Sequence, residues 1–310
     1  MCGRHPVMTD IALVIGEALV DVVRRDGTET AFPGGSAANC AVALSRLERE
    51  VWFASAWGRD AYGDQLARHL GDNGIAMAGD PARLARTASA TASIGPDGAA
   101  TYAFDISWDP APAVVPDDRT VVVVACGSIG AVLDPGADVV RAELAAYRAT
   151  ALTYYDLNAR PQVTGVGPEL VARVEALIDL ADLVKGSDED LAALWPDASE
   201  ELVASHVLGR GAAALVVTKG EHGATWWSAG GRVDIALVAV EVVDTIGAGD
   251  TFGAAMVDAL WSLGAVGVGA GERVAALTPD GVQDVLSRAV AAAAVTVSRP
   301  GADPPYASEL

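Results

Sequence analysis

Short apolar runs rich in β-branched residues alternate along the chain with longer Ala- and Leu-rich segments of helical period. The runs expected as strands are Ile11–Ile15, Val51–Ala54, Val121–Ala125, Ala151–Asp156, Leu183–Lys185 and Ala214–Thr218. The segments expected as helices are Ser36–Leu47, Gly63–Asn73, Asp138–Ala149, Pro168–Ala181, Asp188–Trp195 and Ser199–Gly209. Continuously apolar strands separated by helices are typical of a parallel sheet that is covered on both faces. The pattern therefore predicts an α/β fold with a doubly wound, mainly parallel central sheet flanked by helices.

Two segments interrupt this alternation with the pattern of a β-hairpin. Residues 20–32 and 87–108 each place two short strands around a turn that contains Asp-Gly, which is a hairpin signal. We expect the hairpins to pair as a small β-sheet that forms a lid over the carboxyl ends of the parallel strands, where open sheets bind ligands. Tyr102 and Phe104 in the second hairpin either cover a ligand or only stabilise the hairpin.

The rest of the chain forms the predicted core domain, made of residues 10–19, 33–86 and 109–310. Residues 1–9 have no periodicity and are expected to be a disordered lead-in. The apolar stretch from residue 11 to residue 20 contains Glu17, so a buried strand is a better interpretation than a signal peptide.

The charge balance excludes several classes of partner. The 310 residues carry 41 Asp and Glu against 21 Lys and Arg, a formal net charge of −20. Nucleic acids and anionic membranes bind mainly to clustered Lys and Arg, so neither is expected here. The cysteines at positions 2, 40 and 126 form no CxxC pair, which favours a reducing cytoplasm. Lys185 and Lys219 are the only lysines, so any phosphate must be held largely by other groups.

The segment Val238–Val257 carries the most chemical information. A strand is expected to end at Val243, followed by a turn at residues 247–249 and by a helix that opens at Asp250 or Thr251. Small residues at a helix N-terminus leave backbone N–H groups open to an anion. Asp250 is then either an N-cap or a general base that takes a proton from an attacking hydroxyl group.

A glycine turn before a helix is also found in dinucleotide-binding sites and in P-loops. Gly247, Gly249 and Gly253 follow a G-x-G-x-x-x-G spacing, which is a weak match to a dinucleotide fingerprint and does not lie in the first βα unit. A P-loop is excluded because Lys185 and Lys219 are each followed by glycine.

A second glycine-rich segment, Pro33–Ala41, leads into the first predicted helix. The paired Gly34 and Gly35 allow a ligand to approach the backbone closely, and Asn39 offers both a donor and an acceptor to hydroxyl groups. The alternative is an ordinary helix start with Ser36 as the N-cap.

In this order, these segments resemble the ribokinase-like (PfkB) carbohydrate kinase family, and most closely its bacterial fructokinase branch. The motifs that carry the resemblance are G-E-x-x-x-D at 16–21, G-G-x-x-x-N at 34–39, G-x-D-x-x-G at 58–63, D-x-N-x-R-P at 156–161, T-x-G-x-x-G at 218–223, D-T-x-G-A-G-D at 244–250 and R-x-G-A-x-P at 299–304. Each motif alone is weak, but together they span nearly the whole chain in the family's order.

The resemblance implies an ATP-dependent sugar kinase, and it assigns roles to individual residues. Asp250 is the general base, and Gly247, Ala248 and Gly249 form an anion hole for the transferred phosphoryl group. The residues implied to bind the sugar are Asp21, Gly34, Gly35, Asn39 and Arg160. Those implied to bind the nucleotide are Ser187, Thr218, Gly220 and Gly223. Asp190 is implied to act on Mg²⁺ through water, and Asp244 to lie at a site for a monovalent cation such as K⁺.

This sequence departs from the family pattern in two places: the N-x-x-E motif, and the segment after Arg160-Pro161, where Gln162–Gly165 stands in place of the fructokinase-like L-W. Ser187 and Asp190 replace the Asn and Glu of the N-x-x-E motif, and alone they also match a capped acidic helix start. Fructose is the first substrate expected. The alternative within the family is 2-keto-3-deoxygluconate or another sugar, because Arg160 offers a partner to a substrate carboxylate.

An NAD-dependent oxidoreductase and a non-catalytic sugar or nucleotide sensor are the alternatives from other classes. A homodimer that forms through the lid is a further expectation.

Overall fold

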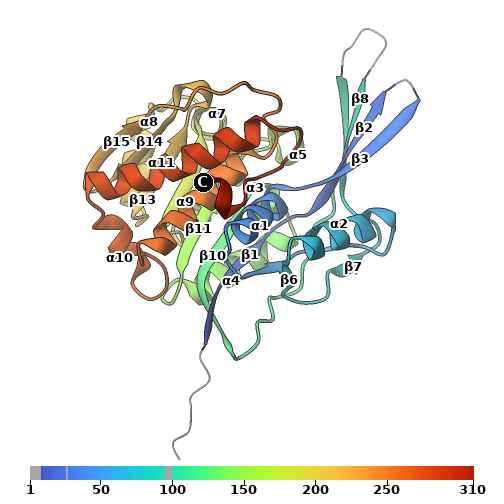
Figure 1. Ribbon diagram of the computed structural model, residues 1–310, viewed down its shortest axis with the longest axis horizontal. Helices are drawn as coiled ribbons and strands as arrows, with labels where there is room; N and C mark the ends of the chain where they lie inside the picture. The colour runs from blue at the N-terminus through green and yellow to red at the C-terminus, as the bar shows by residue number, and fades with distance from the viewer. Residues whose placement is uncertain (1–7, 26, 95–99) are drawn as a thin grey trace, which may run out of the picture.

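The computed structural model describes residues 8–25, 27–94 and 100–310. A nine-stranded sheet crosses its main body in the order β15-β14-β13-β12-β11-β10-β1-β4-β6 (Figure 1). Neighbouring strands from β13 to β6 are parallel, whereas β14 and β15 join antiparallel. The bounds are β1 Thr9–Ile15, β4 Val51–Ala54, β6 Ala76–Met77, β10 Arg119–Gly127, β11 Leu152–Asp156, β12 Leu183–Ser187, β13 Ala214–Thr218, β14 Ala224–Ser228 and β15 Gly231–Ile235.

Both faces of this sheet are buried because its strands are apolar at successive positions. In β1, Ala12 and Val14 pack into one hydrophobic core, while Ile11, Leu13 and Ile15 pack into the other. Side chains that follow one another along a strand point to opposite faces. The continuously apolar runs of the sequence therefore produce a core on each side of the sheet.

Helices cover the two faces in separate layers. Helices α1, α2, α9, α10 and α11 contribute to the first core, and α3, α4, α6, α7 and α8 to the second. Their bounds are α1 Ser36–Arg46, α2 Ala61–Asp72, α3 Ser128–Val132, α4 Gly136–Tyr147, α6 Pro168–Ile178, α7 Asp188–Leu194, α8 Glu200–Gly209, α9 Ala248–Ser262, α10 Ala270–Ala275 and α11 Pro279–Val297. Short helical turns complete the set: α5 Pro161–Thr164, η1 Gly220–His222 and η2 Ala307–Glu309. Within the described ranges, every helix is too short or too polar to cross a bilayer.

The predicted α/β architecture is confirmed, including all the strands and helices named from the alternation. The strand expected to end at Val243 is wrong, because the last strand, β15, ends at Ile235 and residues 236–247 contain no strand. Helix α9 also begins earlier than predicted, at Ala248. Gly247 precedes it with a φ of 74°, a left-handed conformation that glycine adopts without a steric penalty.

The two predicted hairpins form one four-stranded sheet, the small sheet, in the order β3-β2-β8-β9. Its strands are β2 Leu19–Arg25, β3 Thr28–Gly34, β8 Ser89–Ile94 and β9 Ala100–Asp105. Strands β2 and β8 join the hairpins through a parallel pairing. The turn residues 26 and 95–99 lie outside the described residues, as do residues 1–7 of the predicted lead-in. Strand β1 already begins at Thr9.

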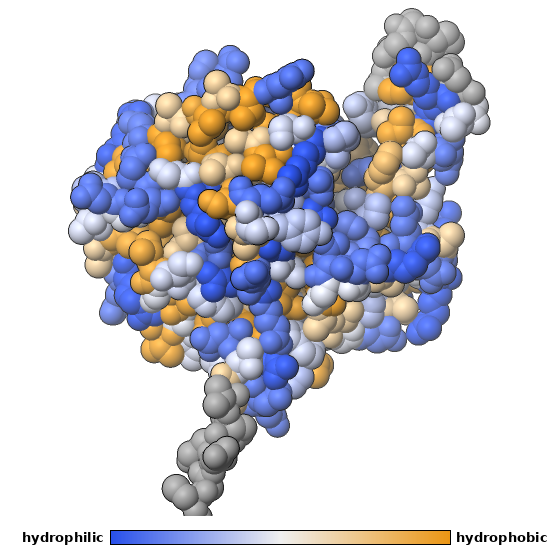
Figure 2. Space-filling view, in the orientation of Figure 1, coloured by the Kyte–Doolittle hydropathy of each residue, from blue (hydrophilic) through white to orange (hydrophobic). Residues whose placement is uncertain are grey.

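The small sheet stands off from the main body (Figures 1 and 2). The strand register places Asp21, Phe32, Ala90 and Phe104 in one row across the sheet, so their side chains share a face. Figure 2 shows hydrophobic residues on the flank of the small sheet beside the main body. A third, two-stranded sheet pairs β5 Trp57–Gly58 with β7 Ala82–Leu84 near the base of this region.

Candidate active site

A pocket of about 340 Å³ lies between the small sheet and the main body. The small sheet and the β1–β2 turn contribute one wall, and the N-termini of α1, α3 and α9 contribute the other. The polar side chains that line the pocket are Glu17, Asp21, Ser36, Asn39, Ser128, Asn158, Arg160, Thr245 and Asp250. The chain therefore gathers residues that are up to 233 positions apart, from Glu17 to Asp250, around one recess.

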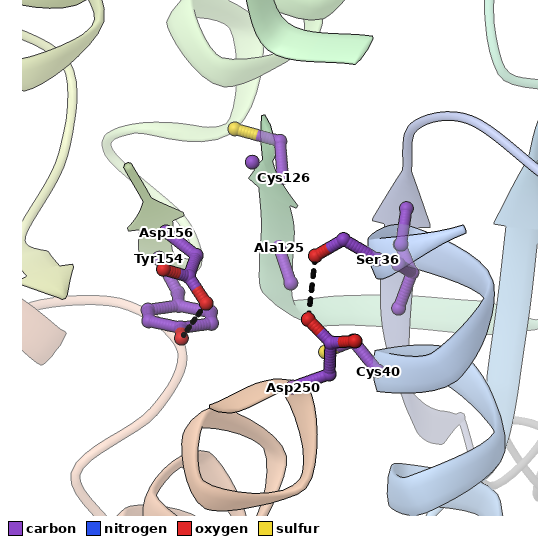
Figure 3. A pocket seen from close by; sticks show the side chains of 10 residues that line it. Ser36, Cys40, Ala125, Cys126, Tyr154, Asp156 and Asp250 are labelled. Atoms are coloured by element: carbon purple, nitrogen blue, oxygen red, sulfur yellow. Dashed lines mark hydrogen bonds between the residues drawn. The ribbon is translucent and has the colours of Figure 1, made fainter. Parts of the chain in front are cut away.

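Asp250 lies in the first turn of α9 and faces the N-terminus of α1. Its Oδ1 accepts a hydrogen bond of 2.6 Å from the Ser36 hydroxyl group (Figure 3). Its Oδ2 accepts one of 2.8 Å from the Asn39 amide. The N-cap interpretation of Asp250 is wrong, because Gly247 is the N-cap of α9. The N-cap interpretation of Ser36 is also wrong, because Gly35 caps α1 and the Ser36 side chain turns to Asp250.

The N-terminus of α9 offers backbone donors beside this carboxylate. The N–H groups of Ala248 and Thr251 donate to Thr245 and Gly247 carbonyls. Within the described part of the chain, the N–H groups of Gly249 and Asp250 have no acceptor. Unpaired N–H groups at the positive end of a helix bind anions. Of the residues predicted to form the anion hole, Gly249 keeps a free N–H group, whereas the Ala248 N–H is engaged with Thr245; Asp250 adds a further free N–H group.

A lysine lies directly beneath this helix N-terminus, which the sequence reasoning missed. Lys185 on β12 is buried, and its Nζ lies 2.8 and 3.0 Å from the two carboxylate oxygens of Asp156 on β11. A Cβ atom placed on Gly249 would lie 3.5 Å from the same Nζ. Burial alone would lower the pKa of Lys185, but the Asp156 carboxylate raises it, so the ammonium group stays charged.

A small cavity of about 10 Å³ lies behind Asp250, between α1, β10 and β11 (Figure 3). Its lining includes Cys40, Cys126, Tyr154 and Asp156. Burial raises the pKa values of the Cys40 and Cys126 thiols far above their usual range, so both stay neutral. The cavity is about the size of one water molecule, and it separates the Asp156–Lys185 pair from Asp250.

Glu17 is a second residue that sequence reasoning left without a role. It is almost completely buried, and its two oxygens accept backbone N–H groups from Ser36 at 3.0 Å and Gly130 at 2.9 Å. Burial raises the pKa of Glu17 to about 7, and the Asp250 carboxylate adds to this rise. Glu17 therefore fastens the N-termini of α1 and α3 together at the floor of the pocket. A glutamate within an otherwise apolar run was the signal for it.

The residues predicted to bind the sugar lie in this pocket or on its edge. Asp21 and Asn39 line it, as do Gly35 and Arg160. Gly34 stands directly before them, and a Cβ atom there would collide with the Asp21 carboxylate. Burial raises the pKa of Asp21 to about 6, while the Arg160 guanidinium opposes this rise. The structure thus brings the predicted sugar-binding residues together.

The residues predicted to bind the nucleotide lie beside α9, at the ends of β12 and β13. Ser187 and Thr218 are neighbours in the parallel register, so the two chain ends meet at the same edge of the sheet. Gly220 begins the turn η1, and Gly223 follows it with a φ of 90°. These residues do not line the pocket of about 340 Å³, so they form a separate group at the carboxyl ends of β12 and β13.

Asp190 makes a capping box with Ser187, as the sequence pattern alone indicated. Its Oδ2 accepts the Ser187 N–H at 2.7 Å, and its Oδ1 accepts the Ala159 N–H at 2.7 Å. Asp190 therefore connects α7 to the loop that carries Arg160. Asp244 makes a similar connection, because its Oδ2 accepts the Gly301 N–H at 2.9 Å and so lies beside the C-terminal segment.

Comparison with known proteins agrees with this geometry. Residues 9–309 match the model of the pfkB family carbohydrate kinases. A fructokinase from Rhizobium leguminosarum bv. trifolii is 31% identical over 80% of this chain and 79% of its own length. Fructokinase-1 from Oryza sativa subsp. japonica is 30% identical over 100% of this chain and 97% of its own.

The fold is also similar to that of solved structures. The crystal structure of a fructokinase with bound ATP from Xylella fastidiosa aligns with a TM-score of 0.82 and 25% identity, covering 97% of this chain and 94% of that chain. These matches confirm the resemblance that the sequence motifs carried. The chain belongs to the pfkB family of carbohydrate kinases.

Proposed function

We propose that this protein transfers the γ-phosphate of ATP to a hydroxyl group of fructose. The observation that carries the proposal is the position of Asp250, whose carboxylate opens into the pocket beside the free N–H groups at the start of α9. A base and an anion site at one point are what phosphoryl transfer to a hydroxyl group needs. The fructokinases among its relatives, one of them solved with bound ATP, support fructose as the sugar and ATP as the nucleotide.

In this mechanism Asp250 accepts the proton of the attacking hydroxyl group while the sugar lies in the pocket. The free N–H groups of Gly249 and Asp250 face the transferred phosphoryl group, and the Lys185 ammonium beneath Gly249 adds positive charge. Groups that are fixed before the reaction stabilise developing charge without reorganising. The small sheet acts as a lid that excludes water, which competes with the sugar as phosphoryl acceptor.

The charges of the pocket favour a neutral sugar over a sugar acid. The carboxyl groups of Glu17, Asp21 and Asp250 line it, and Arg160 is its one cationic side chain among the described residues. A substrate carboxylate, such as that of 2-keto-3-deoxygluconate, would meet more negative than positive charge there. Fructose has no charge, and its hydroxyl groups match the Asp21 carboxylate and the Asn39 amide.

In this proposal the nucleotide lies along Ser187, Thr218, Gly220 and Gly223. Among the described residues, no group of three or more His, Cys, Asp or Glu side chains is arranged to hold a metal ion. Mg²⁺ fits nevertheless, because it usually keeps several waters and binds through substrate phosphates with one or two carboxylates. Each Asp190 oxygen accepts one N–H group and keeps a lone pair for a metal-bound water. Mg²⁺ neutralises phosphate charge when bound.

Two further parts of the proposal concern ions and assembly. A monovalent cation such as K⁺ would lie between Asp244 and the backbone of residues 299–304, where the Asp244–Gly301 hydrogen bond already joins the two segments. A homodimer would form through the small sheet, whose exposed Val23, Phe32 and Tyr102 offer apolar area. The cytoplasm, where ATP is supplied, is the proposed location.

The test is ADP release by the purified protein with ATP and Mg²⁺ against fructose, ribose, glucose and 2-keto-3-deoxygluconate. Fructose should give the highest kcat/KM, and Asp250→Asn should lower kcat by roughly 10²–10⁴-fold, the typical contribution of general acid–base catalysis. Asp280→Asn is the matched control, because Asp280 lies in the first turn of α11 and outside the pocket.

Three results would contradict this proposal. The first is a wild-type protein that phosphorylates no sugar, which would favour a sensor. The second is an Asp250→Asn variant that keeps most of its kcat. The third is a higher kcat/KM for 2-keto-3-deoxygluconate than for fructose, which would overturn the argument from pocket charge.

A further inference from the structure

Ser36 forms hydrogen bonds with residues from three other segments that line the pocket. Its backbone N–H donates to Glu17, and its hydroxyl group donates to Asp250 Oδ1 at 2.6 Å. The same hydroxyl oxygen accepts a hydrogen bond of 2.8 Å from the Asn158 amide nitrogen. Asn158, Ser36 and Asp250 therefore form a continuous chain of hydrogen bonds that ends on the proposed base.

The chemistry of Asn158 sets the direction of this chain. An amide nitrogen can only donate, so Ser36 Oγ must act as acceptor toward Asn158, and its single proton is left to point at Asp250. Asn158 is itself held in place, because its backbone carbonyl accepts a hydrogen bond of 3.2 Å from the Ser128 hydroxyl group. Its backbone has a φ of 36°. The Ser36 hydroxyl is thus oriented before any substrate binds.

A donor at this position fixes the orientation of the Asp250 carboxylate. The carboxylate lies among the acidic side chains of Glu17, Asp21 and Asp156. The hydrogen bond from Ser36 to Oδ1 and the one from Asn39 to Oδ2 hold its two oxygens in place, and charge-assisted O–H···O⁻ bonds near 2.6 Å are among the strong ones. The titratable groups that surround Asp250, from every element packed against it, are Glu17, Asp21, Cys40, Tyr154, Asp156, Arg160 and Lys185.

We propose that Ser36 and Asn158 are positioning residues that hold the Asp250 carboxylate in the orientation needed for proton transfer. The inference rests on the proposed kinase function and goes beyond it, because the base, the anion hole and the sugar contacts do not require this pair. Both residues act through Asp250 rather than on the substrate, so they affect kcat more than KM.

The first test is Ser36→Ala with fructose and ATP. Loss of the donor should lower kcat about tenfold, because the carboxylate is no longer held in one orientation, while KM for fructose changes less than about threefold. Ser36→Thr keeps a hydroxyl group and should restore most of the activity. Ser45→Ala is the matched control, because Ser45 lies at the other end of α1 and donates to Asn73.

The second test reverses the polarity of the chain with Asn158→Asp. A carboxylate accepts, so it draws the Ser36 proton away from Asp250, and it also adds a negative charge. The same substitution in a Ser36→Ala background measures the charge effect alone. If the chain exists, the double variant lowers kcat no further than Asn158→Asp does by itself. If Ser36 and Asn158 act independently, their two effects on kcat multiply.

A third measurement does not depend on activity. Ser36→Ala, Asp250→Ala and the double variant form a thermodynamic cycle in urea unfolding of the full chain. We expect the unfolding equilibrium constant to rise about tenfold less on Ser36→Ala when Asp250 is already absent, since their mutual bond is then already lost. Additive effects would overturn the inference, whether or not the wild type is a kinase.

The kinetic results separate the two proposals. A wild type that phosphorylates no sugar contradicts the proposed function, while the urea cycle still decides whether Ser36 bonds to Asp250. An active enzyme whose Ser36→Ala variant raises KM without lowering kcat would instead make Ser36 a sugar-binding residue, and the positioning role would be wrong.

Discussion

The floor of the pocket and the small sheet that faces it are built in opposite ways. On the floor and directly behind it, Glu17, Asp156 and Lys185 are all buried, and each bonds to a residue that is distant in the sequence. On the small sheet, Phe32, Tyr102 and Phe104 are 52%, 66% and 42% exposed. The floor holds charge without contact with solvent, whereas the small sheet leaves apolar surface in contact with it.

This difference separates the two tasks of a kinase site. Buried charges that are paired and hydrogen-bonded keep their positions, so the floor can present Asp250 and the anion hole in fixed geometry. Exposed apolar side chains gain free energy only when something covers them, so the small sheet is suited to close over a bound sugar. We therefore expect substitutions on the floor to change stability and kcat, and substitutions on the small sheet to change KM.

Lys185→Met should give the largest effect. It leaves Asp156 buried without its partner, and breaking a buried ion pair in this way costs about 3–5 kcal/mol. The free energy of unfolding, measured in urea, should fall by this amount, and kcat should fall as well because Gly249 loses the positive charge beneath it.

A second substitution separates the two effects of Lys185→Met. Asp156→Asn in the Lys185→Met background removes the unpaired charge and should recover much of the stability. It should not recover kcat, because the ammonium group is still missing. Equal recovery of both quantities would mean that Lys185 serves only the fold, and that the floor does not differ from an ordinary core in function.

Substitution of Glu17 should give a smaller effect on the free energy of unfolding, and this effect depends on pH. Its pKa is about 7 in the folded protein against 4.5 in the unfolded chain, so the folded state binds the extra proton between these values. The contribution to stability is therefore complete below about pH 4.5 and is lost as the pH rises through 7. Burial also raises the pKa values of Asp21 and Asp156, so these groups act in the same direction.

The measurement is the free energy of unfolding between pH 5 and pH 8. Glu17→Gln should remove about 1–3 kcal/mol of the wild-type decrease over this range, as expected for a pKa rise of a few units. Glu29→Gln on the small sheet is the control, because Glu29 is exposed and bonds to Arg24 instead. A decrease that is unchanged by Glu17→Gln would show that Glu17 is not the group that titrates.

The sequence predicted the fold well because hydrophobic period and turn residues are local signals. The parallel strands, the flanking helices and the two hairpins were all readable from such patterns. The expected strand before Val243 failed because apolar residues alone do not form a strand: residues 236–247 join no sheet, and the Val243 N–H instead donates to the Val297 carbonyl at the end of α11.

The candidate site was predicted less completely, for a physical reason. The position of Asp250 beside a glycine turn could be read locally, but its partners Ser36 and Asn39 lie on a helix 211 to 214 residues away. Lys185 looked like a residue of a buried strand, and only the pairing of β11 with β12 places it against Asp156. Contacts of this kind follow from the tertiary fold, so single motifs cannot reveal them.

The smallest expected effect is on the small sheet, and it tests the other side of the comparison. Phe104 lines the pocket, whereas Tyr102 stacks on it at 6.4 Å between ring centroids and does not line the pocket. Phe104→Ala should raise KM for fructose about three- to tenfold, because the closed sheet then covers less of the sugar. Tyr102→Ala should raise it less than about twofold.

Neither substitution should change the free energy of unfolding by more than about 1 kcal/mol, since both rings are exposed. If Phe104→Ala lowers kcat or stability as strongly as a substitution on the floor, the small sheet is part of the rigid core and does not act as a lid.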